Sequence, residues 1–386
     1  MQDTVATPHL RILHVLTLNG RNGEYGGPVR VARELCSDLS NRGHSTHIFS
    51  GAYLGSEPEL KQGLSESFVL VKPLSKKLPV SSLWSWKLIG TLIKLIKQSD
   101  VVHIHFARDL IPFLTAVISL FSRTPFVTQT HGMIISDNRI STRIIDNLFT
   151  RPILNKSRIN LVLTATELSA VSKIGFKSAS QVLPNGITVQ SKNLESHNKM
   201  NRVVFCSRLN KRKGVDKYIE IADFFRKSEI KFDIYGPDGG ELELVNREIK
   251  NRNLEGVLEY KGALAAGEVL TMLSKIDLLI LPSKDEPFPM VILEALSVGT
   301  SVLVMPSCGI ARELQQFSSS FVSKTEDING LVESVNEFLE SSTSQNREKI
   351  MNYCKTQFSI ESVCNDLEQL YFNLTSRNYG SAQSEI

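Results

Sequence analysis

Residues 10–50 read LRILHVLTLNGRNGEYGGPVRVARELCSDLSNRGHSTHIFS. The stretch begins with an apolar run, Leu10–Leu16, that is typical of a buried parallel strand. A glycine-rich loop follows, and Pro28 suits the first turn of the helix predicted for Val29–Leu39. Ser45–Ser50 then begins the next strand. This order of strand, loop, helix and strand is the building unit of a doubly wound parallel sheet.

The same alternation continues along the chain and is interrupted once, by the polar stretch Gln190–Arg202, which is typical of a linker. We therefore expect an α/β protein with two Rossmann-like parallel-sheet domains, residues 1–190 and 191–375, facing each other across a cleft. The last helices are expected to pack back on the first domain. A disordered tail is expected at residues 376–386, because this segment is terminal and polar.

Composition and charge limit the class of protein. Of 386 residues, 41% are hydrophobic and 22% are charged, which is ordinary for a soluble enzyme. We find neither a signal peptide nor an apolar run of about 20 residues, so we expect a cytoplasmic protein. Residues 1–190 carry 21 Lys and Arg against 12 Asp and Glu, a net charge of +9 that fits an anionic partner or a plain solvated face. The five scattered cysteines predict neither a disulfide framework nor a zinc site.

The most informative segment follows the predicted strand Leu278–Leu281 and reads PSKDEPFPMVILEALSVG, residues 282–299. Glu286 lies in a loop before a predicted helix, and Glu294 lies on that helix. Ionised carboxylates accept hydrogen bonds, so the pair suits two parts of one hydroxyl-rich ligand. The structural alternative is a pair of carboxylates that complements the helix dipole. The flanking Pro-Ser and Ala-Leu-x-x-Gly favour a functional site.

A basic loop follows the first predicted strand of the second half. It reads SRLNKRKG, residues 207–214, and precedes the predicted helix Val215–Arg226. Arginine binds phosphate oxygens with two hydrogen bonds, lysine acts as a point charge, and a helix N-terminus adds positive potential. The loop is therefore a candidate diphosphate site through Arg208 and Lys213, although its charge alone fits a solvated basic loop equally well.

Glycines and a histidine mark the loops of the first half. Gly26 and Gly27 end the first loop, where missing side chains allow backbone N–H groups to approach a phosphate or a sugar. They match neither a dinucleotide fingerprint nor a Walker loop, so a plain turn is the simpler interpretation. His131 follows a predicted strand. A metal site with His103 and His105 is an alternative, but no acidic ligand stands at metal-like spacing, so we expect no metal.

Together these segments resemble the retaining glycosyltransferases of family 4, which adopt the GT-B fold. The resemblance runs from about Leu10 to Tyr371. Its motifs are RGH at 42–44, DVVHIH at 100–105, THGM at 130–133, PNG at 184–186, SRL with KG within 207–214, and Glu286-x7-Glu294.

The resemblance implies a role for each matching residue. Arg208 and Lys213 would hold the diphosphate of a nucleotide-sugar donor, and Glu286 would bind the hydroxyls of the transferred sugar. Glu294 would bind the ribose, and His131 would face the transferred sugar. Further contacts with the donor are implied for Gly26, Gly27, Gly262, Pro287 and Phe288.

Some positions depart from the family pattern. Pro287 stands where the family usually has glycine, and Cys308-Gly309 replaces a Gly-Gly pair. The sugar preference therefore stays open. Two other functions also stay open: a nucleotide-sugar 2-epimerase on a similar scaffold, and a non-catalytic sugar-nucleotide-binding protein. The presence of Arg208, Lys213 and the two glutamates counts against both.

The resemblance also implies the reaction partners. These are a nucleotide-diphosphate sugar and a saccharide or lipid-linked acceptor in polysaccharide or glycoconjugate synthesis, with no cofactor, metal or nucleic acid. No carboxylate pair suited to double displacement is evident, so we expect front-face attack. The predicted helix Ser82–Lys97 carries two tryptophans among lysines and aliphatic residues. It predicts peripheral contact with an anionic membrane surface, with a core-facing helix as the alternative.

Overall fold

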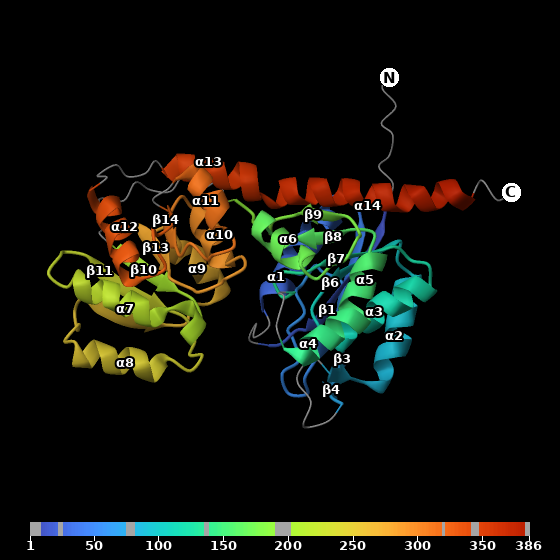
Figure 1. The fold of residues 1–386 in the computed structure, drawn as a ribbon, viewed down its shortest axis with the longest axis horizontal. Coiled ribbons are helices and arrows are strands. Elements are labelled where there is room, and N and C mark those ends of the chain that lie inside the picture. Colours follow the sequence, from blue (N-terminus) through green and yellow to red (C-terminus); the bar gives the residue numbers. More distant parts are fainter. Residues whose placement is uncertain are drawn as a thin grey trace, which may run out of the picture. The chain divides into compact units, whose positions relative to one another are not determined.

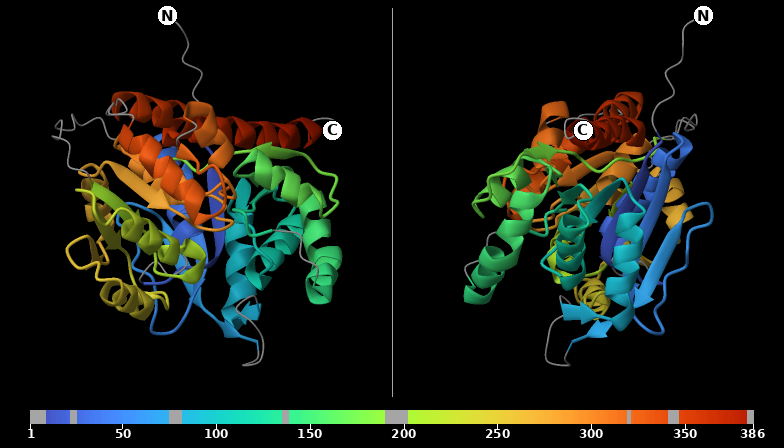
Figure 2. Two further views of the ribbon diagram at one scale, coloured as in Figure 1. Left: turned by 60° about the vertical axis from the view of Figure 1, so that its left-hand side comes forward. Right: turned by 90° about the vertical axis from the view of Figure 1, so that its right-hand side faces the viewer.

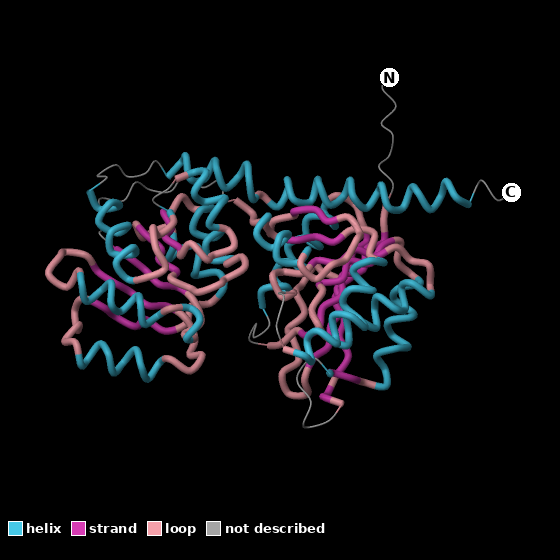
Figure 3. The backbone as a smooth tube through the Cα atoms, in the orientation of Figure 1, coloured by secondary structure: helices cyan, strands magenta, loops and turns pink. Residues whose placement is uncertain are grey.

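The computed structural model describes residues 9–21, 26–74, 82–134, 139–189, 202–318, 321–340 and 347–382. The chain divides into two compact units. The first unit comprises residues 1–186 and 360–386, and the second comprises residues 187–359. Each unit contains a parallel sheet with helices packed around it (Figures 1 and 3). The expected α/β architecture with two parallel-sheet domains is therefore confirmed.

The sheet of the first unit has seven strands in the order β3-β2-β1-β6-β7-β8-β9. Their bounds are β1 (Arg11–Leu18), β2 (Ser45–Ala52), β3 (Glu66–Leu70), β6 (Val101–His105), β7 (Phe126–Gln129), β8 (Asn160–Val162) and β9 (Ser180–Val182). All their pairings are parallel, and the register places His14 of β1 beside His103 of β6. The short strands β4 (Lys72–Pro73) and β5 (Leu83–Trp84) form a separate antiparallel pair.

Helices cover both faces of this sheet, as the two views in Figure 2 show. On one face α3 packs against β1 and β6, and α2 packs on α3. On the other face α1 packs against β2, and α14 packs against α1 and β6. The helical elements are α1 (Gly26–Asn41), α2 (Trp86–Lys97), α3 (Leu110–Phe121), α4 (Ile140–Ile145), the π-helical turn η2 (Asp146–Thr150), α5 (Arg151–Lys156), α6 (Ala165–Ser172) and α14 (Ile360–Ala382).

The second unit is built on five parallel strands in the order β12-β11-β10-β13-β14. They are β10 (Arg202–Cys206), β11 (Lys231–Tyr235), β12 (Leu258–Gly262), β13 (Leu278–Leu281) and β14 (Ser301–Val304). The helical elements are the 3-10 turn η3 (Lys211–Lys213), α7 (Val215–Phe224), α8 (Leu242–Asn251), α9 (Ala266–Leu273), α10 (Met290–Ser297), α11 (Ala311–Phe317), α12 (Ile328–Glu340) and α13 (Arg347–Phe358). Because β10 and β13 are neighbours, the loops that follow them meet at one edge of the sheet.

Two segments differ from the sequence-based expectation. The helix expected from Ser82 begins only at Trp86, because Ser85 is extended and Leu83–Trp84 pairs with Lys72–Pro73. At the other end of the chain, α14 continues to Ala382, through most of the stretch for which we expected a disordered tail. Residues 383–386 lie outside the described residues.

Candidate active site

The basic loop after β10 is held in a fixed conformation by local caps. The Asn210 side chain accepts a hydrogen bond from the backbone N–H of Arg212 and so caps η3. Gly214 ends η3 in the left-handed region, with φ of +75°, and begins α7. A Cβ at Gly214 would lie 2.2 Å from the carbonyl oxygen of Pro282, so the loop after β10 packs directly on the loop after β13.

This packing brings together two of the residues singled out in the sequence. Lys213 Nζ lies 2.7 Å from Glu286 Oε2, and Arg212 lies 3.3 Å from the same oxygen. The Glu286 side chain is only 11% exposed, whereas that of Arg212 is 57% exposed. A largely buried carboxylate thus lies beside two cations at the edge of the sheet. That these residues bind a nucleotide-sugar donor stays a prediction.

The loop that carries Glu286 is clamped from the far side by Gly309. The Gly309 N–H donates to the backbone carbonyl of Glu286 at 2.8 Å. A Cβ at Gly309 would lie 2.0 Å from the carbonyl oxygen of Pro287, so no side chain fits there without moving the loop. Phe288 is buried and packs edge-on against Phe358. The Phe288 ring therefore anchors the loop inside the second unit.

Arg208 and Glu294 both lie close to the end of β10. Ser207 and Leu209, on either side of Arg208, donate backbone hydrogen bonds to Tyr235 and Pro237, which extends the pairing of β10 with β11. Glu294 is buried on α10. Burial and then the charge of Glu294 raise the pKa of Cys206, the last residue of β10, to about 12. Gly262 ends β12 with φ of +84°, and its carbonyl accepts the Gly236 N–H.

In the first unit, His131 occupies the loop at the carboxyl end of β7. It is nearly buried and has φ of +49°, an unusual conformation for a residue with a side chain. Gly26 and Gly27 form the first turn of α1, and a Cβ at Gly27 would meet no atom within 4 Å. Residues 22–25 of the glycine-rich loop lie outside the described residues.

The residue that holds the His131 loop, Glu167, was not predicted from the sequence. Glu167, in the first turn of α6, is buried, and its carboxylate accepts hydrogen bonds from Thr130 Oγ1 and the Gly132 N–H, one on each side of His131. Its second oxygen accepts the Leu163 N–H at 2.6 Å. In the sequence Glu167 looks like an ordinary first-turn carboxylate after the N-cap Thr164, so only the three-dimensional contact reveals its role.

We expect Glu167→Gln to lower kcat about 10- to 100-fold, because an amide NH2 would face N–H and O–H donors and shift the His131 loop. Steady-state kinetics and thermal unfolding check this expectation. The matched control is Glu59→Gln, an exposed position in the same unit, which should leave kcat unchanged. Full activity of a folded Glu167→Gln protein would contradict a positioning role.

The histidines form a stack instead of a set of converging ligands. His14, His103 and His105 lie close enough to be compared with a metal site. Their rings stack on one another, however, and both ring nitrogens of His103 are hydrogen-bonded, to Tyr371 and Gln129. Metal ligands must instead direct free lone pairs at one point. The geometry of these three histidines therefore favours hydrogen-bonded imidazole rings over a metal site.

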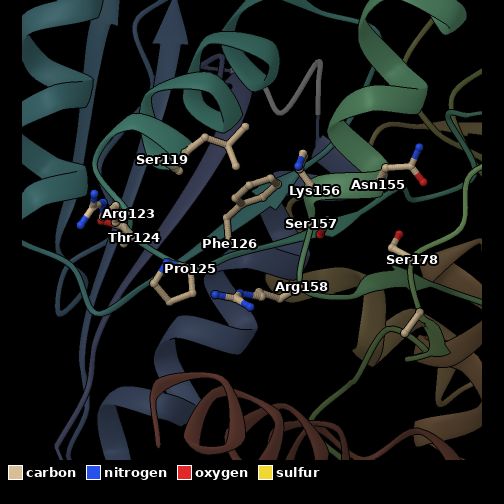
Figure 4. Close-up of a pocket in the computed structure, with 12 residues that line it drawn as sticks. Ser119, Arg123, Thr124, Pro125, Phe126, Asn155, Lys156, Ser157, Arg158 and Ser178 are labelled. Carbon is tan, nitrogen blue, oxygen red and sulfur yellow. The ribbon is translucent and has the colours of Figure 1, made fainter. Parts of the chain in front are cut away.

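A hollow of about 670 Å³ opens at the amino ends of β7, β8 and β9, whereas His131 follows the carboxyl end of β7. Figure 4 shows the residues that line the hollow. Three cations, Arg123, Lys156 and Arg158, line it, and no acidic residue does. None of the three forms an ion pair within the described part of the chain. Because parallel sheets bind substrates at the carboxyl edge, this basic hollow is separate from the candidate active site.

Comparisons with known proteins point to glycosyltransferases. The family model described as Glycosyl transferases group 1 matches residues 187–357, and the one described as Glycosyltransferase Family 4 matches residues 25–191. The D-inositol 3-phosphate glycosyltransferase of Pseudarthrobacter chlorophenolicus is 24% identical over 336 residues, which cover 76% of this chain and 77% of that protein. The N-acetyl-alpha-D-glucosaminyl L-malate synthase of Bacillus anthracis is 21% identical over 365 residues, covering 90% and 94%.

Solved structures share the fold. HepE of Anabaena in complex with UDP superposes with a TM-score of 0.74 at 15% identity, over 95% of this chain and all of that one. The sucrose-phosphate synthase of Thermosynechococcus elongatus gives a TM-score of 0.74 at 16% identity, over 96% of this chain and all of that one. The chain belongs to glycosyltransferase family 4, with the GT-B fold. It is a retaining glycosyltransferase that uses a nucleotide-sugar donor.

Proposed function

We propose that this glycosyltransferase takes a hexose from a UDP-activated donor and transfers it to a saccharide or lipid-linked acceptor. The contact between Lys213 and Glu286 is the observation that carries the proposal. A lysine next to a carboxylate suits a diphosphate and the hydroxyls of the sugar attached to it, which supports the proposal. Solved structures of HepE contain UDP, UDP with glucose, or UDP-glucose, and a solved structure of TarM contains UDP, which supports a uridine donor.

Different residues of the second unit are proposed to bind different parts of the nucleotide-sugar donor. Arg208 and Lys213 are proposed to bind the diphosphate, whose negative charge increases as it leaves. Glu286 binds hydroxyls of the transferred sugar, and Glu294 binds the ribose. The Gly262 backbone contacts the base.

His131 and the backbone at Gly27, in the first unit, are proposed to contact the transferred sugar and the donor phosphate, respectively. The bond from the anomeric carbon to the diphosphate oxygen breaks while the acceptor oxygen bonds to the same face. The acceptor hydroxyl proton passes to the departing diphosphate, so configuration is retained without a second carboxylate.

A nucleotide-sugar screen tests this function. UDP-glucose and other UDP-hexoses should raise the unfolding temperature of the full chain more than GDP- or ADP-sugars do. With a membrane extract as acceptor, proton NMR of the product should show the anomeric configuration of the donor. Conversion of the nucleotide sugar without any acceptor would indicate an epimerase instead, and no ligand-induced stabilisation by any nucleotide sugar would overturn the proposal.

We further propose that the first unit contacts an anionic membrane surface through α2. Leu88, Leu92 and Ile96 face the core, as the alternative interpretation expected, whereas Trp86 is 89% exposed. Lys94 and Lys97 occupy the last turn of α2. The cations of the basic hollow add positive charge to the same unit. Within the described residues, no helix combines the length and apolar character needed to cross a bilayer.

A vesicle sedimentation assay checks the membrane contact. Wild-type protein should bind vesicles containing phosphatidylglycerol, in a salt-sensitive manner, and should not bind phosphatidylcholine vesicles. The double variant Lys94→Gln/Lys97→Gln should bind roughly 30-fold more weakly, on the basis of about 1 kcal/mol per lysine. Lys349→Gln/Lys355→Gln, exposed positions on α13, carries the same charge change as a control. Equal binding to both kinds of vesicle would contradict this contact.

A further inference from the structure

A connected row of buried imidazoles leads to His131 in the first unit. His14 Nδ1 lies 3.1 Å from His105 Nε2, and His105 Nδ1 lies 2.7 Å from His131 Nε2. The residues come from β1, β6 and the loop after β7, so three neighbouring strands place them side by side. The His103 ring packs beside those of His14 and His105, but its own hydrogen bonds go to Tyr371 and Gln129.

All members of the row are neutral near pH 7. Burial lowers the pKa of His131 to about 3 and holds the pKa values of His14 and His105 well below their usual range. A neutral imidazole has one N–H and one bare nitrogen. The N–H direction in one ring therefore sets the direction in the next, and the row has only two consistent arrangements: every N–H points toward His131, or every N–H points toward His14.

His14, at the end of the row away from His131, decides between these two arrangements. His14 Nε2 is fully buried and has no hydrogen-bond partner in the described part of the chain. If the N–H groups pointed toward His14, this atom would be a buried, unpaired N–H. In the other arrangement it is a bare acceptor. Unpaired buried N–H groups are the rarer of the two in folded proteins, so the N–H groups point toward His131.

His131, at the other end of the row, then presents a hydrogen-bond donor. With His105 donating to Nε2 of His131, the proton of His131 is on Nδ1. That atom has no hydrogen-bond partner among the described residues, and 8% of the His131 surface is exposed. An imidazole of this tautomer can donate a hydrogen bond from Nδ1, and it has no lone pair there to act as a base.

We propose that His14 and His105 are positioning residues that fix His131 as a neutral imidazole with its proton on Nδ1, so that it donates a hydrogen bond to an oxygen of the transferred sugar. The hydrogen bond from His131 to the transferred sugar rests on the proposed function. The tautomer itself is a property of the resting protein and can be measured without any substrate. Failure to find a donor sugar therefore leaves this test intact.

Nitrogen-15 NMR of histidine-labelled full chain tests the proposal directly. The His131 signals are assigned as those missing from His131→Gln, and the expected result at pH 7 is the tautomer with the proton on Nδ1. In His105→Phe, which keeps a ring in the stack, His131 should shift toward the Nε2–H tautomer. With an active donor, kcat should fall about tenfold, on the scale of one hydrogen bond, while KM for the donor stays within about twofold.

Tyr371→Phe is the matched control, because it removes a buried hydrogen bond to His103 without touching the row. It should leave the His131 tautomer and kcat unchanged. A wild-type His131 with its proton on Nε2 overturns the proposal, and so does a His105→Phe protein in which His131 keeps its tautomer. If His105→Phe fails to fold, His14→Phe provides the second variant, and the wild-type spectrum decides the tautomer in either case.

Discussion

Replacing Lys213 by methionine is expected to lower kcat by about two to three orders of magnitude, the effect of removing one preorganised charge from a developing anion. Methionine keeps the unbranched stem of lysine but lacks the ammonium group that lies 2.7 Å from Glu286. Glu286 retains Arg212 as a partner at 3.3 Å, so the carboxylate is not left unpaired. The variant should therefore fold, with a loss in the free energy of unfolding of about 1–3 kcal/mol, the scale of one hydrogen bond to a charged group.

The control for Lys213→Met is Lys211→Met, which removes the same charge from the same turn. Lys211 is exposed and forms no ion pair within the described chain. Its variant should keep kcat within a few-fold of wild type. Single-turnover kinetics with saturating donor separate the chemical step from donor binding. A folded Lys213→Met protein with near-normal turnover would rule out charge neutralisation by this lysine.

Replacing Gly309 by alanine is expected to disable the enzyme although Gly309 carries no chemistry. The added methyl group would lie 2.0 Å from the Pro287 carbonyl oxygen, more than 1 Å inside ordinary contact. Either the loop of Glu286 and Pro287 moves, or the loop after β14 does, and the hydrogen bond from the Gly309 N–H to Glu286 is strained in both cases. A displacement of about 1 Å at reacting groups costs about 100-fold in kcat, and overpacking costs about 1–3 kcal/mol of stability.

Gly267→Ala is the matched control for Gly309→Ala. Gly267 lies in α9 of the same unit, and a Cβ there would meet no atom within 4 Å. Alanine in this helix should leave kcat unchanged and raise the free energy of unfolding by up to about 1 kcal/mol. Thermal unfolding and kcat are measured for both variants. If Gly309→Ala behaved like its control, the clamp on the Glu286 loop would be refuted.

The sequence predicted the layers and loops because these depend on local patterns. Buried parallel strands are continuous apolar runs, and the candidate residues follow them directly, as Arg208 follows β10 and Glu286 follows β13. Family resemblance supplied the roles of these residues. That β10 and β13 are neighbours is a property of strand order, so the contact of Lys213 with Glu286 had to come from the structure.

Other features could not be predicted, because they depend on contacts between distant residues. Glu167 lies 35 residues from Gly132, to which it is hydrogen-bonded. The hydrogen bond between His14 and His105 spans 91 residues. The strand Glu66–Leu70 was not predicted because it is a short, half-polar edge strand. The helical segment from α4 to α5 was not predicted because its exposed apolar residues obscure the helical pattern.

The return of α14 to the first unit has a consequence for biosynthesis. Tyr371 and Cys364 of α14 are fully buried, and Glu368 bonds to both Arg42 and His44. The nascent first unit thus lacks part of its interior until α14, which follows the whole second unit in the sequence, has left the ribosome. A messenger truncated before codon 360 would yield a complete second unit attached to an unfinished partner with an open apolar surface, a product suited to capture by chaperones and proteases.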